Sequence, residues 1–250
     1  MKSQSVRRIG LVRALSKLGY CSRSQATELI RAGRVQLNGR PRRDPETPAN
    51  LGRDRIKVDG QDVEASRKVY LVMNKPRGLV TTASDEKGRD TVYSILEKDN
   101  LPWVAPVGRL DKASEGLLLL TNDSEWGSRV AAPETHLEKT YHVQIDAKAG
   151  GGLIQSMMRG VREEGELLQA RQVRVLRSGE KNCWLEIVLN EGKNRQIRRM
   201  LTALGVEVLR LVRVAIGPLQ LGTLVKGACR SLNAQEKRTL DRAMENRARR

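Results

Sequence analysis

The sequence places an aspartate, Asp111, in a setting that suits chemistry, within the stretch VGRLDKASEGLLLLTND at residues 107–123. The apolar run from Leu117 to Thr121 predicts a buried strand that follows the turn holding Asp111. Catalytic groups are often found in such loops, because a rigid sheet fixes the geometry of a loop that it carries. The pattern alone leaves two roles open: a catalytic carboxylate, or a carboxylate that caps the turn by accepting backbone hydrogen bonds.

A second group of chemically able residues is the arginine cluster of NRQIRRMLTAL. Arg195, Arg198 and Arg199 lie at helical spacing, so at most one of them can face Asp111. Chemistry at Asp111 requires an ionised carboxylate in a pocket from which water is largely excluded. Burial alone would raise the pKa of that carboxylate, and an arginine held against it opposes the shift. We expect the other two arginines to contact phosphate, and the alternative is that all three contact only phosphate. Lys193 is a further cation nearby, and its pattern does not decide between RNA and the pocket.

The sequence contains two other arrangements of polar groups that could do chemistry. Tyr141 lies in the alternating segment Thr140 to Ile145, where an aromatic side chain more often packs than reacts. Asp111 and Glu115 are four residues apart and offer the two carboxylates of a glycoside hydrolase. That spacing puts both groups on one side of a sugar bond, and the strongly basic charge has no purpose for a neutral glycan, so we disfavour this reading.

Metal chemistry is not indicated by the cysteines and histidines. Cys21, Cys183 and Cys229 are scattered without the spacing of metal ligands, and His136 and His142 are the two histidines available to join them. We therefore expect reduced cysteines and no metal.

Composition points to a polyanionic partner. The 250 residues carry a formal net charge of +17, and paired Lys and Arg attract phosphates. Sixteen Lys and Arg stand against seven Asp and Glu in residues 1–68, so over half of the net charge lies there. No run of 18 or more apolar residues and no signal-peptide pattern is present. We expect a nucleic-acid-binding protein of the cytoplasm that contacts no membrane.

The first part of the chain predicts a small domain over residues 9–66. Leu11–Gly19 reads as a short helix closed by glycine, and Ser22–Gly33 as a second helix with Ser22 as its N-cap. Arg34–Arg40 alternates up to an Asn-Gly turn, and Arg55–Gly60 repeats that pattern. The order helix, helix, strand, turn, strand follows.

A larger domain is predicted over residues 69–235, because strand and helix patterns alternate there. Strands are expected at Val69–Met73, Leu117–Thr121, Thr140–Ile145 and Trp184–Leu189, and helices at Ser124–Ala131, Leu153–Arg159 and Arg195–Leu204. Residues 236–250 are expected to be a basic C-terminal tail into which a helix frays. The fold class is α+β, with a mixed sheet in the larger domain.

The phrase GYCSRSQATELIRAGRVQLNG resembles the S4 RNA-binding module found in a ribosomal protein and several RNA-modifying enzymes. The resemblance spans about Ile9 to Glu64. It implies that the second helix and the following loop present basic side chains to folded RNA, namely Lys17, Arg23, Arg31 and Arg34. The alternative is that these charges form a solvated face of a small domain.

The phrase GRLDKASEGLLLLTND resembles the catalytic motif of the ribosomal RNA pseudouridine synthases, in the branch with small-subunit and large-subunit enzymes that carry an N-terminal S4 domain. NKPRG at residues 74–78, EKTYHV at residues 138–143 and EGKNRQIRRM at residues 191–200 resemble that branch's other motifs, in the same order. Together the resemblances cover the chain to about Leu232.

The resemblance implies that Asp111 is the catalytic carboxylate, that Tyr141 packs on the target base and helps to remove its C5 proton, and that Arg198 pairs with Asp111. Leu110 and Leu117 are expected to wall the pocket. RNA contacts are also expected from Lys75, Arg109, Lys193, Arg195 and Arg199.

It further implies an isomerase without cofactor, acting on a uridine in a loop or bulge of folded ribosomal RNA, with the large subunit favoured. The partner is expected to be this RNA, either free or within an assembly intermediate of the ribosome. A monomer is the default oligomeric state. The alternative is a non-catalytic RNA-binding assembly factor, in which the S4-like part binds RNA and the larger domain serves only for docking.

Overall fold

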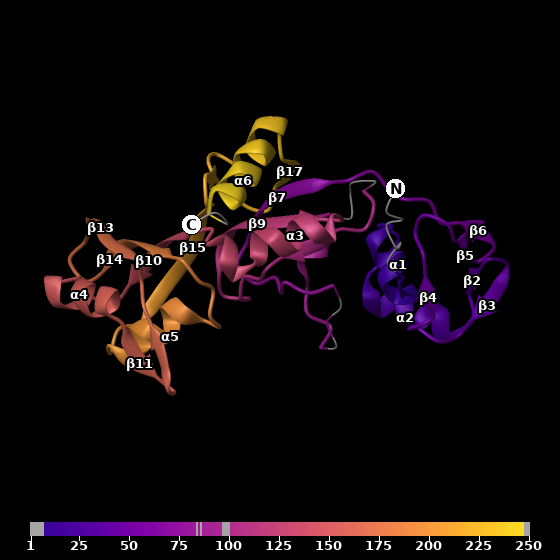
Figure 1. Cartoon of the computed structure of the whole chain (residues 1–250). Helices are drawn as coiled ribbons and strands as arrows, with labels where there is room; N and C mark the ends of the chain where they lie inside the picture. Colours follow the sequence, from indigo (N-terminus) through magenta and orange to yellow (C-terminus); the bar gives the residue numbers. More distant parts are fainter. Residues whose placement is uncertain (1–7, 84, 86, 97–100, 248–250) are drawn as a thin grey trace. The chain divides into compact units, whose positions relative to one another are not determined.

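The computed structural model describes residues 8–83, 85, 87–96 and 101–247 (Figure 1). The chain divides into two compact units. The first holds the described residues of 1–70, 97–105 and 120–125, and the second holds those of 71–96, 106–119 and 126–250.

The first unit has a helical pair and a small antiparallel sheet, as the sequence predicts. The helices are α1 (Leu11–Lys17) and α2 (Arg23–Arg31). The sheet has the strand order β3-β2-β5-β6, with bounds β2 (Val35–Leu37), β3 (Arg40–Arg42), β5 (Ile56–Val58) and β6 (Gln61–Asp62). A separate two-stranded pair joins β1 (Ile9–Gly10) to β4 (Pro48–Ala49).

Local sequence signals explain these elements. Ser22 caps α2 in a capping box, since its side chain accepts from the Gln25 amide while the Gln25 side chain accepts from the Ser22 amide. Both hairpins turn on residues in the left-handed region, Asn38-Gly39 and Asp59-Gly60, which the tight hairpin turn requires. An aliphatic core of α1, α2, β2 and β5 side chains lies beneath.

The second unit is built on a mixed sheet with the strand order β13-β14-β10-β15-β9-β7-β17. Within it β9 and β15 run parallel, whereas β10 runs antiparallel to both β14 and β15. Two short strands pair outside this path, β8 with β9 and β16 with β15. The bounds are β7 (Tyr70–Lys75), β8 (Ala105–Val107), β9 (Glu115–Thr121), β10 (Lys139–Ile145), β13 (Gln172–Ser178), β14 (Cys183–Leu189), β15 (Val208–Ile216), β16 (Leu219–Gln220) and β17 (Cys229–Ser231).

Helices and one hairpin pack around this sheet. They are α3 (Ser124–Ala131), α4 (Gly151–Arg159), α5 (Gln196–Ala203), α6 (Ala234–Arg247), the 3-10 helices η1 (Val92–Ile95) and η2 (Pro133–Thr135), and the hairpin β11 (Val161–Glu163) and β12 (Glu166–Leu168). In Figure 1 α5 lies against β11. The α+β fold with a mixed sheet is confirmed.

The strand β9 shows how the sheet positions a loop. Every residue of β9 is buried, as its apolar run predicts. At its start Gly116 has φ +102°, and a Cβ there would lie 2.2 Å from the Arg213 carbonyl oxygen of β15. Glycine is required because the parallel neighbour approaches this closely. The loop before β9 is therefore anchored directly to the middle of the sheet.

The C-terminal segment differs from the expected tail. Helix α6 continues through Arg247, and Leu240 and Met244 are buried. The Trp126 indole donates to Asp241 at 2.8 Å. The segment from residue 236, predicted as a tail into which a helix frays, is thus a packed helix to residue 247, because two apolar residues one turn apart bury one of its faces. Residues 248–250 of the predicted tail lie outside the described residues.

Candidate active site

Asp111 lies in the loop between β8 and β9, and backbone hydrogen bonds hold that loop in place. The Ser114 amide donates to the Asp111 carbonyl at 2.9 Å, and the Gly78 amide donates to the Lys112 carbonyl at 2.8 Å. The Thr81 hydroxyl donates to the Leu110 carbonyl at 2.8 Å. The NKPRG turn and the segment after it therefore act as a support for the Asp111 loop.

Lys75 of the NKPRG turn is fully buried beneath the Asp111 loop. Its side chain is 0% exposed, and its ammonium donates to the carbonyls of Pro76, Asp111 and Ser114 at 3.0, 3.2 and 2.9 Å. Burial lowers the pKa of Lys75 to about 8, although the charges of Asp111 and Glu115 oppose the shift. The expected RNA contact by Lys75 is not what the structure shows, because three backbone carbonyls draw the side chain inward. It instead braces the loop.

The cation nearest to Asp111 differs from the expected one. Arg195 Nη1 lies 3.6 Å from Asp111 Oδ2. Arg198 donates to the carbonyls of Ala113 and Val208, both at 3.2 Å, and its Nε is buried without a hydrogen-bond partner. Burial lowers the pKa of Arg198, Arg195 lowers it further, and Asp111 opposes both effects. Arg198 therefore lies within the electrostatic reach of Asp111 without an ion pair in the free protein.

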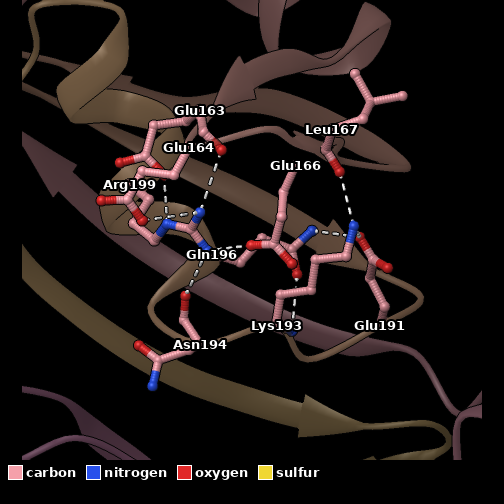
Figure 2. A network of polar contacts seen from close by, with 9 residues as sticks. All are labelled: Glu163, Glu164, Glu166, Leu167, Glu191, Lys193, Asn194, Gln196 and Arg199. Carbon is pink, nitrogen blue, oxygen red and sulfur yellow. Dashed lines mark hydrogen bonds and ion pairs between the residues drawn. The ribbon is translucent and has the colours of Figure 1, made fainter.

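Arg199 has a role other than the expected phosphate contact. Figure 2 shows its guanidinium among the carboxylates of the β11–β12 hairpin: Glu163, Glu166 at 2.6 Å and Glu164 at 3.7 Å. Only 16% of the side chain is exposed. Three carboxylates satisfy this cation, so it ties the hairpin to α5.

The same network holds the segment just before α5 (Figure 2). Gln196 donates to Glu191 at 2.9 Å and to the Gln169 carbonyl at 3.1 Å. Lys193 donates to the Leu167 carbonyl at 2.7 Å and lies 3.4 Å from Glu191. The N-cap of α5 is Arg195, whose φ of +47° is a left-handed conformation that non-glycine residues seldom adopt. The network stabilises the segment that presents Arg195.

A cavity of about 390 Å³ brings the remaining predicted residues together. This volume lies in the range of roughly 300–1,000 Å³ that is usual for small-molecule sites. Seven of the predicted residues line it: Arg109, Leu110, Asp111, Tyr141, Lys193, Arg195 and Arg198. Leu117, expected in the wall, lies fully buried in β9 and does not line this cavity. Its side chain belongs to the sheet core instead.

The Asp111 carboxylate is not enclosed in the free protein. Its side chain is 40% exposed, whereas the sequence led us to expect a pocket from which water is excluded. The rival carboxylate Glu115 is only 5% exposed, does not line the cavity, and is held by Arg210 at 2.9 Å and Lys226 at 2.5 Å. Asp111 and Glu115 therefore do not face each other across a sugar site.

Lys139 and Arg213 also line the cavity, and sequence reasoning missed both. Lys139 lies two residues before Tyr141 in β10, and Arg213 lies opposite Tyr141 in the neighbouring strand β15. The run VLRLVRVAI of β15 alternates as a strand should. That signal, together with the alternation of β10, could have placed both cations beside Tyr141.

The side chains of the first unit that were expected to bind RNA are exposed or partly exposed to solvent. Arg23 and Arg31 are exposed on α2. Arg34 donates to both carboxylate oxygens of Asp59, at 2.8 and 2.5 Å, and Lys17 donates to Glu125 at 2.8 Å. The two latter cations thus have acidic partners that the sequence did not reveal.

The described residues offer neither a metal site nor a membrane-spanning helix. No group of three or more His, Cys, Asp or Glu among them is arranged to hold a metal ion. Among the helices of the described part of the chain, none combines the length and apolarity needed to cross a membrane.

Comparison with known proteins agrees with this arrangement. Residues 69–203 match the RNA pseudouridylate synthase family, and residues 9–54 match the S4 domain. An uncharacterized RNA pseudouridine synthase of Aquifex aeolicus is 38% identical over 231 residues, which are 92% of each chain. The ribosomal large subunit pseudouridine synthase B of Bacillus subtilis is 35% identical over 233 residues, covering 92% of this chain and 94% of that protein. A crystal structure of a pseudouridylate synthase superposes with a TM-score of 0.64 at 29% identity, covering 93% of this chain and 99% of that one.

Proposed function

Because the chain belongs to the RNA pseudouridylate synthase family and carries an S4 domain, we propose that it converts a specific uridine of ribosomal RNA to pseudouridine with Asp111 as its catalytic carboxylate. The observation that carries the proposal is the cavity. Asp111 from the loop before β9, Tyr141 from β10 and Arg198 from α5 line one space of about 390 Å³. Three separate elements converge there.

The reaction needs little more than these groups. The bond from uracil N1 to the ribose C1′ breaks, the uracil turns while it stays bound, and C5 forms a new bond to C1′. C5 then loses its proton and N1 gains one, so the product is an isomer and no oxidant, reductant or cofactor is consumed. Asp111 either attacks the sugar or removes a sugar proton as the uracil departs. Tyr141, 9% exposed beside it, packs on the base and assists the loss of the C5 proton.

The uridine must leave its helical stack to reach Asp111, at a cost of a few kcal/mol that is smallest in a loop or bulge. The Asp111 side chain is 40% exposed, which supports a site that stays open until the flipped uridine enters. The free site is open to water, and the incoming nucleotide and its flanking RNA cover the carboxylate. Once water is displaced, the charges of the site act more strongly on the reacting sugar.

The two arginines beside Asp111 have complementary roles in this proposal. Arg195 lies 3.6 Å away with half of its side chain exposed, so RNA phosphate can draw it off. Arg198 is fixed by the carbonyls of Ala113 and Val208 and takes over as the partner of Asp111 when the nucleotide is bound. A planar, permanently charged guanidinium suits that role because it can bind both carboxylate oxygens.

The proposed substrate is large-subunit ribosomal RNA. The similarity to the Bacillus subtilis large-subunit enzyme supports it, since that relative is matched over 92% of this chain. The S4 domain grips folded RNA through exposed cations such as Arg23 and Arg31, and Arg109, Lys193 and Arg195 meet RNA at the cavity. The three cysteines are free, which supports a reducing compartment such as the cytoplasm. A monomer is the default oligomeric state in this proposal.

Release of tritium tests the proposal. The protein is incubated with large-subunit ribosomal RNA that carries tritium at uridine C5, and tritium in water is counted. The wild-type protein should release a stoichiometric amount for each modified site. Asp111→Asn should reduce the release to the uncatalysed background, while RNA affinity stays nearly unchanged because phosphate contacts dominate it.

Asp90→Asn is the matched control, since Asp90 is exposed in the same unit and does not line the cavity. It should release tritium at the wild-type rate. No release by the wild-type protein from any ribosomal RNA would instead favour the non-catalytic assembly factor. Release that survives in Asp111→Asn would remove Asp111 from the mechanism.

A further inference from the structure

Lys139 and Arg213 are two of the six cations that line the cavity. In the described part of the chain neither Lys139 nor Arg213 has an ion-pair partner, although both line the cavity. Tyr141 pairs across β10 and β15 with Arg213, so the two side chains lie on the same face of the sheet. A β-bulge between Thr140 and Tyr141 interrupts the register beside them, and bulges often re-aim side chains next to a site.

Arg213 is buried without full satisfaction of its guanidinium. The residue is 5% exposed, and its Nε donates to the Leu117 carbonyl at 2.7 Å. Its Nη2 is buried and has no hydrogen-bond partner. An unpaired buried donor on a charged group is costly, so each case calls for an explanation. The other atoms of this kind among the described residues are Arg198 Nε and, in the first unit, Arg42 Nε. Two of the three therefore belong to residues that line the cavity and lack an acceptor.

The electrostatics favour an anion as that acceptor. Burial lowers the pKa of Lys139, and the neighbouring Arg213 lowers it further. Two like charges at one partly buried place destabilise each other, and a bound anion stabilises both. Two other cations of the cavity already have carboxylates nearby, since Arg195 faces Asp111 and Lys193 faces Glu191. A neutral uracil carbonyl would accept hydrogen bonds without offsetting the repulsion.

We propose that Lys139 and Arg213 form a subsite for the phosphate group attached to the nucleotide that enters the cavity. This inference rests on the proposed function, which makes the cavity a nucleotide site, and it goes beyond it by assigning the anchor. The chemistry explains why the anchor is a phosphate. The uracil must turn freely once its bond to ribose is broken, so fixed contacts have to hold the part that does not move. The sugar and phosphate are that part.

Mononucleotides test the subsite without any turnover. The wild-type protein is titrated with uridine, uridine 5′-monophosphate and uridine 3′-monophosphate, and dissociation constants are measured by NMR. At least one monophosphate should bind about tenfold more tightly than uridine, the gain expected from charge-assisted hydrogen bonds to a fixed phosphate. The two monophosphates distinguish the 5′ from the 3′ phosphate as the group that is held.

Lys139→Gln and Arg213→Gln should each remove most of this preference and leave the affinity for uridine unchanged. Unchanged uridine affinity also reports that the cavity is intact. Arg177→Gln is the matched control, because Arg177 is an exposed arginine of the same sheet, on β13, that does not line the cavity. It should keep the full preference for phosphate.

Three results would overturn the inference. One is equal binding of uridine and both monophosphates by the wild-type protein. Another is a phosphate preference that survives in both variants. The third is an equal loss in Arg177→Gln, since that would make the preference a general effect of charge. Arg213→Gln removes the hydrogen bond to the Leu117 carbonyl and could therefore lose uridine binding as well. In that case the phosphate preference of Lys139→Gln alone tests the inference.

The outcome is separable from that of the tritium assay. A phosphate preference without tritium release would refute the isomerase and keep the subsite. Tritium release by the wild-type protein without a phosphate preference would do the opposite.

Discussion

The two units of the molecule hold their basic side chains in opposite ways. In the first unit Arg23 and Arg31 project from α2 into water, and the Arg34–Asp59 ion pair has 55% and 47% of its side chains exposed. In the second unit Lys75 is fully buried and Arg213 nearly so. One set of cations is placed on a surface, whereas the other is built into the sheet.

The difference shows what each set can do. An exposed cation costs little to place and is screened by salt, so it acts through number and proximity to phosphate. A buried cation has lost its water and needs named partners, here the carbonyls of Pro76, Asp111 and Ser114 for Lys75 and that of Leu117 for Arg213. Such a cation acts through its position. We therefore expect the first unit to supply affinity for RNA and the second to supply geometry at the site.

The largest effect that would break this contrast concerns two glycines. Gly116 and Gly60 both have positive φ, +102° and +81°. An added Cβ at Gly116 would meet backbone atoms of Arg213 at 2.2 and 2.8 Å, whereas nothing lies within 4 Å at Gly60. Gly116→Ala should cost more than about 4 kcal/mol of unfolding free energy, and Gly60→Ala only the roughly 1–2 kcal/mol of the left-handed backbone.

Hydrogen exchange under native conditions can measure both losses unit by unit. Amides of β9 and β15 should lose protection in Gly116→Ala, and amides of β5 and β6 should lose less in Gly60→Ala. Similar losses for the two variants would mean that the second unit is no more tightly constrained than the first.

The next largest effect follows from the buried ammonium of Lys75. The pKa of Lys75 falls from 10.5 to about 8 on folding. Between these values the unfolded chain holds more protons, so raising the pH favours the folded state. The wild-type protein should gain up to about 3 kcal/mol relative to Lys75→Met as the pH rises from 8 to 10.5, and the difference should be flat below 8.

Urea denaturation across that pH range measures the difference. Lys57→Met is the control, since Lys57 of the first unit keeps a third of its side chain exposed beside Asp62, and it should follow the wild-type curve. A wild-type protein that loses stability relative to Lys75→Met over the same range would contradict the burial of a charged lysine.

The contrast also explains what the sequence could predict. The strands β9, β10 and β14 and the helix α3 follow from apolar periodicity, and Ser22 and Asn38-Gly39 follow from cap and turn chemistry. These signals are local. The placing of Asp111 in a loop before a buried strand is of the same kind, and so is the set of exposed arginines on α2.

The errors lie where partners come from distant parts of the chain. No residue close to Lys75 in the sequence indicates that its ammonium will donate to the carbonyls of Asp111 and Ser114, which are 36 and 39 residues away. Arg199 meets its carboxylates across 33 to 36 residues. Helical spacing alone could not indicate that Arg195 would form the ion pair with Asp111. Such choices depend on tertiary packing, which no local pattern encodes.

The smallest effect sharpens the contrast on the side of the first unit. Arg23→Gln combined with Arg31→Gln should weaken binding to large-subunit ribosomal RNA about tenfold at physiological salt. The slope of log affinity against log salt should flatten by about 1.4–1.8, because two fewer phosphate contacts release counterions. The rate of tritium release at saturating RNA should stay at the wild-type value, since neither arginine lines the cavity. Filter binding at several salt concentrations gives the slope. Arg242→Gln, exposed on α6, is the control for a general loss of charge.

A double variant with a normal slope and a reduced rate at saturation would contradict this prediction. It would mean that these surface arginines act through their position, and the division between affinity and geometry would fail.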